Sequence, residues 1–377
     1  MLRELRAFLS SMISRKRSKP LDYPSGLLDP RPAREAIMEP LKLQVTLWPS
    51  FPHFPRFAKD KRLQGIRLNS AMIDVKELEM ELEGIDPTKA PVPLYFDIKG
   101  RQLRIHEVIP NDKRLEFVLN HPIEVETPVM VLFKAGADGA LLEEVKDGRH
   151  LIFHGGPKFK VRAGESLHIR DKSLKVLGPQ FTDMELKKIE MVVAAGFKHY
   201  YLSYVENQAD VDEFRSYIGD DSELRLKIEN KRGLRYVANE FKPSDNTSLV
   251  AARGDLYVEV NQPHDIIKAL KLIISKDPRA CVGSRLLLSV IRGPVPECHD
   301  FSDLAWLYDI GFRDMLLCDE LCLKEDLLGT AINVFDAFRM EYANDRVPSG
   351  SPAGKRGLHS VHGPILRSRK GDAGSTG

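Results

Sequence analysis

The sequence has few cysteines, and they are not spaced like a disulfide framework. Four occur in 377 residues, all in one late segment, at Cys281, Cys298, Cys318 and Cys322. Secreted domains that depend on disulfides are usually small and carry cysteines at a much higher density. The sequence therefore favours a reduced, cytoplasmic protein.

A hydrophobic run long enough to cross a membrane is also missing. The N-terminal stretch MLRELRAFLSSMISRKRSKP is interrupted by Ser10 and Ser11, and its basic cluster follows its apolar part. A spanning helix needs about 20 apolar residues, and a signal peptide begins with its basic residues. We interpret residues 1–40 as an N-terminal extension, with contact to a membrane surface or a partner as the alternative.

The net charge of the whole chain is small, at +2, but its distribution is uneven. Residues 1–19 and residues 346–377 each contain six lysines or arginines against one acidic residue, so the stretch between them carries a net charge of −8. An acidic folded region argues against nucleic-acid binding. Residues 344–377 are rich in glycine, serine, proline and arginine, which predicts a disordered basic tail.

Short β-branched runs alternate with stretches of helical periodicity through most of the chain. The strand candidates are residues 41–48, 64–70, 92–98, 199–205, 224–229, 248–256, 279–287 and 313–320. Eight strand–helix units predict an α/β fold, a (β/α)₈ TIM barrel. Residues 105–177, after the third strand, contain only short strands and turns. We expect them to form an inserted β lid domain, with the barrel at residues 41–104 and 178–343.

Charged residues at the predicted strand ends indicate a functional site, because TIM barrels carry their chemistry there. Lys227 and Glu229 are two residues apart and so face the same way from one strand. Burying both is costly unless they pair with each other, with a metal or with a charged ligand. Asp255 follows one unit later, and two neighbouring carboxylates suit Mg²⁺. An internal Lys227–Glu229 ion pair is the purely structural alternative.

Four segments carry a resemblance to a known family. LRLKIENKRGL and SLVAARGDLYVEV resemble the K-I-E-N-x-x-G and V-A-R-G-D-L-x-V-E motifs of pyruvate kinases, at a matching separation. GIRLNSAM is similar to the family's R-L-N-x-S-H, and YFDIKGRQLR is similar to D-T-K-G-P-E-I-R. The resemblance covers roughly residues 41–340. It is that of a divergent, pyruvate kinase-like barrel without the family's C-terminal regulatory domain.

The resemblance implies an activity and a set of site residues. It implies a glycolytic, Mg²⁺-dependent (or Mn²⁺-dependent) transfer of a phosphoryl group from phosphoenolpyruvate to ADP, giving pyruvate and ATP. The matching positions imply catalytic residues Lys227, Arg67 and Ser284, metal ligands Glu229 and Asp255, and substrate contacts Arg253, Gly254, Asp255 and Ser203. Cationic residues around a transferring phosphoryl group also agree with the general physics of that reaction.

The chain departs from the family at the monovalent-cation and nucleotide positions. Asn69 and Asp97 match two K⁺ ligands, whereas Ala71 and Ile98 replace residues with side-chain oxygens. The losses predict an eroded K⁺ site. The nucleotide position is also changed, and it leaves the candidates Arg104 and Lys99.

Other functions stay open from the sequence alone. One is a non-catalytic protein that binds phosphoenolpyruvate or a 2-oxo acid, and another is a Mg²⁺-dependent lyase or aldolase on a 2-oxo acid. Arg253, Gly254 and Asp255 also form the triplet of adhesion loops, and the late cysteines with His299 invite a zinc site, although they form no C-x₂-C pair. Small-molecule substrates are the expected partners, and a homo-oligomer is left open.

Overall fold

The barrel sheet forms as the sequence predicts. The structure, a computed structural model, describes residues 40–111 and 114–343, so the extension and the basic tail expected at the two ends lie outside the described residues, apart from Pro40. Eight parallel strands close in the order β1-β16-β15-β14-β13-β12-β3-β2. Their bounds are β1 (Lys42–Thr46), β2 (Gly65–Asn69), β3 (Leu94–Ile98), β12 (His199–Leu202), β13 (Glu223–Ile228), β14 (Thr247–Ala252), β15 (Cys281–Gly283) and β16 (Asp314–Leu316).

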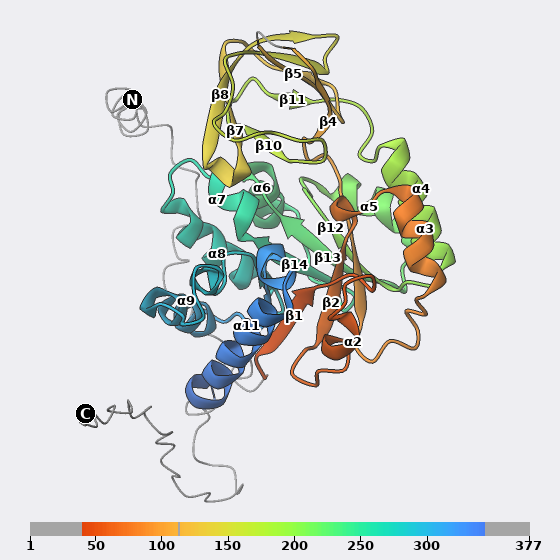
Figure 1. The fold of residues 1–377 in the computed structure, drawn as a ribbon, viewed down its shortest axis with the longest axis vertical. Helices are drawn as coiled ribbons and strands as arrows, with labels where there is room; N and C mark the ends of the chain where they lie inside the picture. The colour runs from red at the N-terminus through yellow and green to blue at the C-terminus, as the bar shows by residue number, and fades with distance from the viewer. Residues whose placement is uncertain (1–39, 112–113, 344–377) are drawn as a thin grey trace, which may run out of the picture.

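Helices surround this sheet and bury its outer face (Figure 1). Their bounds are α2 (Phe54–Phe57), α3 (Val75–Glu83), α4 (Asp183–Ala194), α5 (Gln208–Ile218), α6 (Lys231–Asn239), α7 (Arg253–Glu259), α8 (Asp265–Lys276), α9 (Cys298–Asp309), α10 (Asp319–Cys322) and α11 (Glu325–Phe338). Side-chain caps fix several helix starts, as at Asp74, Thr182 and Asn230. Within the described ranges, no helix is long and apolar enough to cross a membrane.

The barrel interior is filled at the end opposite the candidate site. Tyr95 and Tyr201 belong to a small buried cluster inside the sheet. The Arg225 guanidinium lies 4.4 Å from the centre of the Tyr95 ring and donates to Asp314 at 2.7 Å. This packed plug leaves the other end of the barrel, where the strands finish, as the place for a ligand.

A separate antiparallel sheet follows β3 and has its own core. Six strands are ordered β10-β7-β8-β9-β5-β4, and two more, β6 and β11, pair with each other. Phe117, Phe133 and Phe153 contact one another at the centre of that core. The strands are β4 (Ile105–Ile109), β5 (Leu115–Leu119), β6 (Ile123–Glu124), β7 (Val129–Phe133), β8 (Asp138–Lys146), β9 (His150–His154), β10 (Leu167–Ile169) and β11 (Lys175–Val176).

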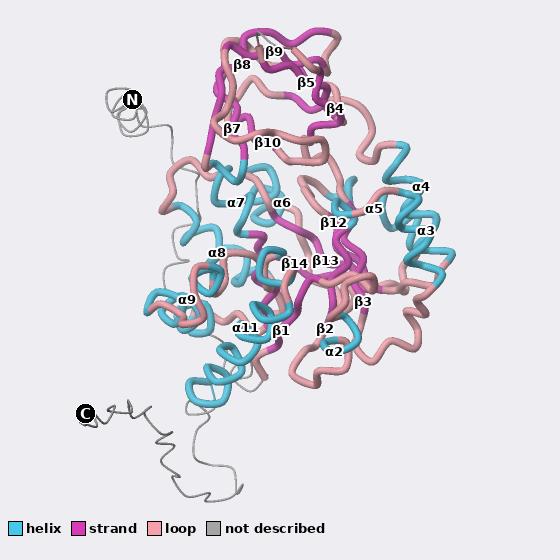
Figure 2. Tube along the Cα trace, in the orientation of Figure 1, coloured by secondary structure: helices cyan, strands magenta, loops and turns pink. Residues whose placement is uncertain are grey.

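This sheet lies at one end of the molecule, beside α6 and α7 (Figure 2). Arg170, just after β10, donates to the backbone oxygens of Val260 and Asn261 in the barrel, at 2.6 and 2.9 Å. The arrangement agrees with a TIM barrel that carries an inserted β domain. The domain limits at residues 104 and 178 remain our proposal.

The sixth barrel strand ends earlier than the sequence predicts, which corrects the strand expected at residues 248–256. The strand stops at Ala252, and Arg253–Glu259 forms α7. Arg253 and Leu256, three residues apart on this helix, are buried, as is Val258, whereas Tyr257 is more than a third exposed. The alternation of apolar and polar residues from Tyr257 to Val260 misleadingly resembles a strand.

The seventh strand is also shorter than the expected residues 279–287. It ends at Gly283, because Ser284, Arg285 and Leu287 have positive φ angles of 67°, 57° and 52°. Such angles lie outside the extended region and turn the chain out of the sheet. The turn brings Ser284 to the rim of the barrel.

Candidate active site

A cleft of about 620 Å³ opens where the barrel strands end. The inserted sheet contributes Lys134, Ala135 and Gly136 to its wall. Asp97 and Ser203 are fully buried beneath it. The cleft is lined by most of the residues predicted from the sequence, namely Arg67, Asn69, Lys99, Arg104, Lys227, Glu229, Gly254, Asp255 and Ser284.

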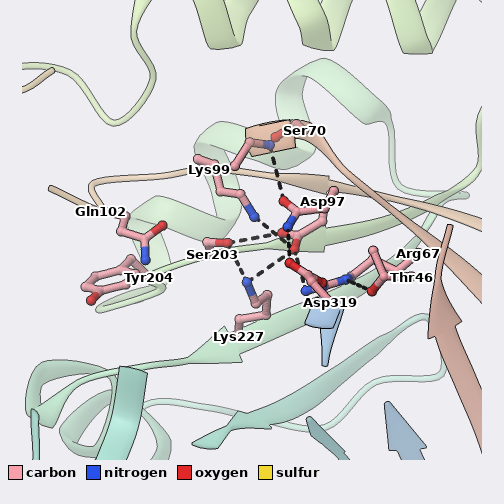
Figure 3. A network of polar contacts seen from close by, with 12 residues as sticks. Thr46, Arg67, Ser70, Asp97, Lys99, Gln102, Ser203, Tyr204, Lys227 and Asp319 are labelled. Atoms are coloured by element: carbon pink, nitrogen blue, oxygen red, sulfur yellow. Dashed lines mark hydrogen bonds and ion pairs between the residues drawn. The ribbon is translucent and has the colours of Figure 1, made fainter. Parts of the chain in front are cut away.

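Asp97 is the centre of a buried ionic network (Figure 3). Its Oδ2 atom lies 2.9 Å from Lys99 Nζ, 3.3 Å from Lys227 Nζ and 3.2 Å from Arg67 Nη1. Ser203 Oγ donates to its Oδ1 at 3.1 Å. Burial by itself would raise the pKa of Asp97, but the three cations hold it well below its usual range.

The position of Lys99 depends on a close approach between two loops. A Cβ atom on Gly100 would lie 2.6 Å from the backbone oxygen of Ser203, so only glycine fits there. Burial lowers the pKa of Lys99 to about 7, although Asp97 opposes the shift. Lys99 is thus held against Asp97.

Lys227 connects Asp97 with the carboxylate that follows its own strand. Its Nζ atom donates to Ser203 Oγ at 2.8 Å and lies 3.1 Å from Glu229 Oε1. Burial by itself would lower the pKa of Lys227, but Asp97 and Glu229 raise it by more, so the pKa lies above its ordinary value. The Lys227–Glu229 ion pair expected as an alternative does form, at the floor of the cleft.

Glu229, which is buried, and Asp255, which is partly exposed, both line the cleft. Burial raises the pKa of Glu229 to about 7, Asp255 adds to this shift, and Lys227 opposes it. Burial also favours the neutral form of Asp255, yet His168 holds its pKa well below the usual range. One carboxyl of the pair is therefore partly protonated near neutral pH, as expected of two neighbouring acids.

His168 belongs to the site although the sequence did not indicate it. It lies on β10 of the inserted sheet, with Nε2 3.3 Å from Asp255 Oδ1 and Nδ1 2.8 Å from Glu259 Oε1. Burial would lower the pKa of His168, but these two carboxylates raise it to about 10. The other Asp255 oxygen accepts from Gln102 Nε2 at 3.1 Å.

Arg104 braces the junction between the barrel and the inserted sheet. Its Nε donates to Gln102 Oε1 at 3.0 Å, and its Nη1 donates to the backbone oxygen of Gly164 at 2.6 Å. It reaches the cleft rim in this position. Its nucleotide role stays a prediction, as does that of Lys99.

Arg67, predicted to contact the substrate phosphate, is bonded to three side chains of the protein itself. Its Nε donates to Thr46 Oγ1 at 2.9 Å, and its Nη1 pairs with Asp97. Its Nη2 pairs closely with Asp319, the first residue of α10. Asn69 Nδ2 also donates to Asp319, at 2.7 Å. Of the two predicted K⁺ ligands, Asn69 thus donates to Asp319 and Asp97 pairs with Arg67.

The side chain of Arg253 points away from the cleft. It pairs with Asp303 at 2.8 Å and donates to the backbone oxygens of Ser284 and Arg285 at 3.1 and 3.0 Å. Arg253 is only 6% exposed, so the triplet it begins does not form an adhesion loop. It holds the strained turn after β15, and Gly254 and Asp255 are the members of the triplet that face the cleft.

The late cysteines do not assemble a zinc site. All four are free, and three of them are buried, whereas Cys298 is exposed. Among the described residues, no group of three or more histidine, cysteine, aspartate or glutamate side chains could hold a metal ion. The predicted magnesium site needs only the two carboxylates of Glu229 and Asp255, because Mg²⁺ is usually bound by one or two carboxylates and completes its shell with water and substrate oxygens.

The fold and the cleft together define a class of protein: a (β/α)₈ barrel whose strand ends carry a buried lysine–carboxylate cluster beneath an inserted β domain. No family model matches the chain. It is 27% identical over 305 residues to a pyruvate kinase of Methanocaldococcus jannaschii, covering 75% of this chain and 65% of that protein. It is 26% identical over 288 residues to a pyruvate kinase of Thermoplasma acidophilum, covering 70% of this chain and 51% of that protein.

A pyruvate kinase of Agrobacterium vitis shows a higher identity over a shorter stretch, 31% over 201 residues, which is 49% of this chain and 39% of that protein. These similarities confirm the resemblance seen in the motifs: over about half to three quarters of its length, the chain is similar to pyruvate kinases. It spans between about half and two thirds of the length of the first two relatives.

Proposed function

We propose that this protein is a Mg²⁺-dependent phosphotransferase that moves the phosphoryl group of phosphoenolpyruvate to ADP, giving pyruvate and ATP. The proposal rests on the observation that Lys227, Arg67, Glu229 and Asp255 all line the same cleft. The names of the similar proteins support the same reaction. A role in glycolysis and a cytoplasmic location belong to this proposal.

Glu229 and Asp255 fit a divalent metal such as Mg²⁺ or Mn²⁺. The raised pKa of Glu229 reflects burial beside a second carboxylate, and a cation would remove that repulsion. Each carboxylate oxygen keeps a further lone pair beyond its present partner. When bound, the metal would polarise substrate oxygens and offset the negative charge that gathers there.

The residues around the pair would position the substrate. Lys227, held by Ser203, would face the charge that develops on the transferring group and the enolate. Arg67 would contact the phosphoryl group, and the Ser284 hydroxyl would relay a proton at the enolate face. Backbone N–H groups at the start of α7, from Gly254 onward, would hold the substrate carboxylate.

Asn69 and Asp97, at the predicted monovalent-cation positions, are bonded to groups of the protein itself. Asp97 is surrounded by three cationic side chains, and the side-chain oxygen of Asn69 accepts from the backbone of Ala71 at 3.2 Å. We propose that these protein cations supply the positive charge, so that K⁺ is not required. We propose Arg104 and Lys99 as the residues on the nucleotide side of the cleft.

The test is a coupled assay of the purified chain with phosphoenolpyruvate, ADP and Mg²⁺. We expect pyruvate formation by the wild type and its loss in Lys227→Met, whereas Lys198→Met, at a surface lysine, retains it. Equal rates in the wild type and in Lys227→Met would reject the proposal.

A second candidate function is binding without turnover. Its support is that both oxygens of Asp255 already contact His168 and Gln102. Calorimetry that shows Mg²⁺-dependent binding of phosphoenolpyruvate, together with no pyruvate in the coupled assay, would favour this candidate.

A further inference from the structure

Asp319 lies where an anionic ligand of Arg67 would bind. It begins α10, its side chain is one third exposed, and it lines the cleft. One of its oxygens pairs with Arg67 Nη2, and the other accepts from Asn69 Nδ2 at 2.7 Å. The carboxylate thus occupies a donor of each residue.

The inner side of Arg67 is also occupied. Its Nη1 pairs with Asp97, and its Nε donates to Thr46. Two carboxylates therefore already balance this guanidinium, which is only 8% exposed. A phosphoryl group that approached it would meet Asp319 first, and two like charges in contact within a partly buried site repel strongly.

The contact is stable at neutral pH. Burial favours the neutral form of Asp319, but Arg67 and Lys99 lower its pKa below the ordinary value. The acid therefore stays charged where the cleft is expected to work.

We propose that Asp319 is a specificity-determining residue, a built-in anion on Arg67 and Asn69 that weakens the binding of a phosphoryl group in the cleft and leaves the binding of an unphosphorylated 2-oxo acid unchanged. A phosphoryl group on Arg67 must displace Asp319, whereas a ligand without a phosphoryl group does not need the donors that Asp319 occupies. The identity of the ligand rests on the proposed function, but the occupancy of Arg67 does not.

The first experiment uses inorganic phosphate, which tests that occupancy alone. We expect Asp319→Asn and Asp319→Ala to bind phosphate about tenfold or more tightly than the wild type, measured by calorimetry and by thermal shift. Adding Arg67→Gln to Asp319→Asn should abolish the gain. A change of less than about twofold in both single variants, with normal thermal unfolding, would overturn the proposal.

Glu320→Gln is the matched control, because Glu320 lines the same cleft next to Asp319. This substitution removes the same charge, but it breaks no ion pair with Arg67, which pairs with Asp319 instead. If it gains phosphate affinity as much as Asp319→Asn does, the effect belongs to the general charge of the cleft and the proposal is wrong.

The second experiment compares phosphoenolpyruvate with pyruvate in the presence of Mg²⁺. Asp319→Asn should tighten phosphoenolpyruvate about tenfold and change pyruvate less than about twofold. An equal change for both ligands would overturn the specificity. The variants could gain phosphate binding while neither they nor the wild type bind phosphoenolpyruvate or pyruvate. That result would reject the proposed function but would still identify Asp319 as the anion on Arg67.

Discussion

Metal binding to Glu229 and Asp255 is expected to release a proton and to weaken as the pH falls. The pKa of Glu229 is raised to about 7, whereas that of Asp255 is held low. Glu229 is then about nine-tenths protonated at pH 6 and about one-tenth protonated at pH 8. Since a divalent cation needs the charged form, the apparent Kd for Mg²⁺ should be about tenfold higher at pH 6 than at pH 8.

Isothermal titration with Mg²⁺ or Mn²⁺ at pH 6, 7 and 8 measures this directly. Two buffers of different ionisation enthalpy at pH 7 count the protons released. Glu229→Gln should bind the metal weakly with little dependence on pH. His168 does not contribute to the slope, because its pKa of about 10 keeps it protonated throughout. A constant Kd with no proton release would show that Glu229 does not lose a proton when the metal binds.

Three further predictions concern the rest of the site. Because Asn69 and Asp97 are bonded within the protein, the rate in K⁺ should stay within about twofold of the rate in Na⁺, and a strict need for K⁺ would contradict this. A Cβ atom on Gly254 would lie 3.5 Å from Ser284 Oγ, an ordinary contact, so Gly254→Ala should unfold like the wild type. It should lose pyruvate formation, because the added methyl group would keep the substrate away from the backbone. An active variant would show that Gly254 does not contact the substrate. His168→Gln should lower stability by a few kcal/mol. Since the folded pKa of His168 exceeds its unfolded value, that loss is full below about pH 6.5 and disappears as the pH rises through about 10, whereas a loss in melting temperature that does not vary with pH would contradict it.

The barrel and half of the site follow from short-range sequence patterns. Eight apolar runs between helical stretches predict the closed sheet, because each strand buries both faces. The two-residue spacing of Lys227 and Glu229 places both at one strand end, and the next unit brings Asp255 beside them. These relations depend only on strand geometry and on the order of strands around a barrel.

The remaining contacts depend on distances that no local pattern encodes. His168 is on a strand of the inserted sheet, and its pairing with Asp255 depends on how that sheet sits on α7. Asp319 follows the last barrel strand, and it meets Arg67 of the second strand only because the barrel closes. The sequence does not predict the helix at Arg253, because a seven-residue segment with alternating polarity fits both a strand and about two turns of helix.

The position of a divalent cation in the cleft tests whether Glu229 and Asp255 are the metal ligands. Crystals soaked with Mn²⁺ and phosphoenolpyruvate, measured at the manganese absorption edge, should give one anomalous peak between the carboxylates of Glu229 and Asp255. The phosphoenolpyruvate should lie between that peak and Lys227. A peak elsewhere, or none while His168 still contacts Asp255, would contradict the assignment of this cleft as the active site.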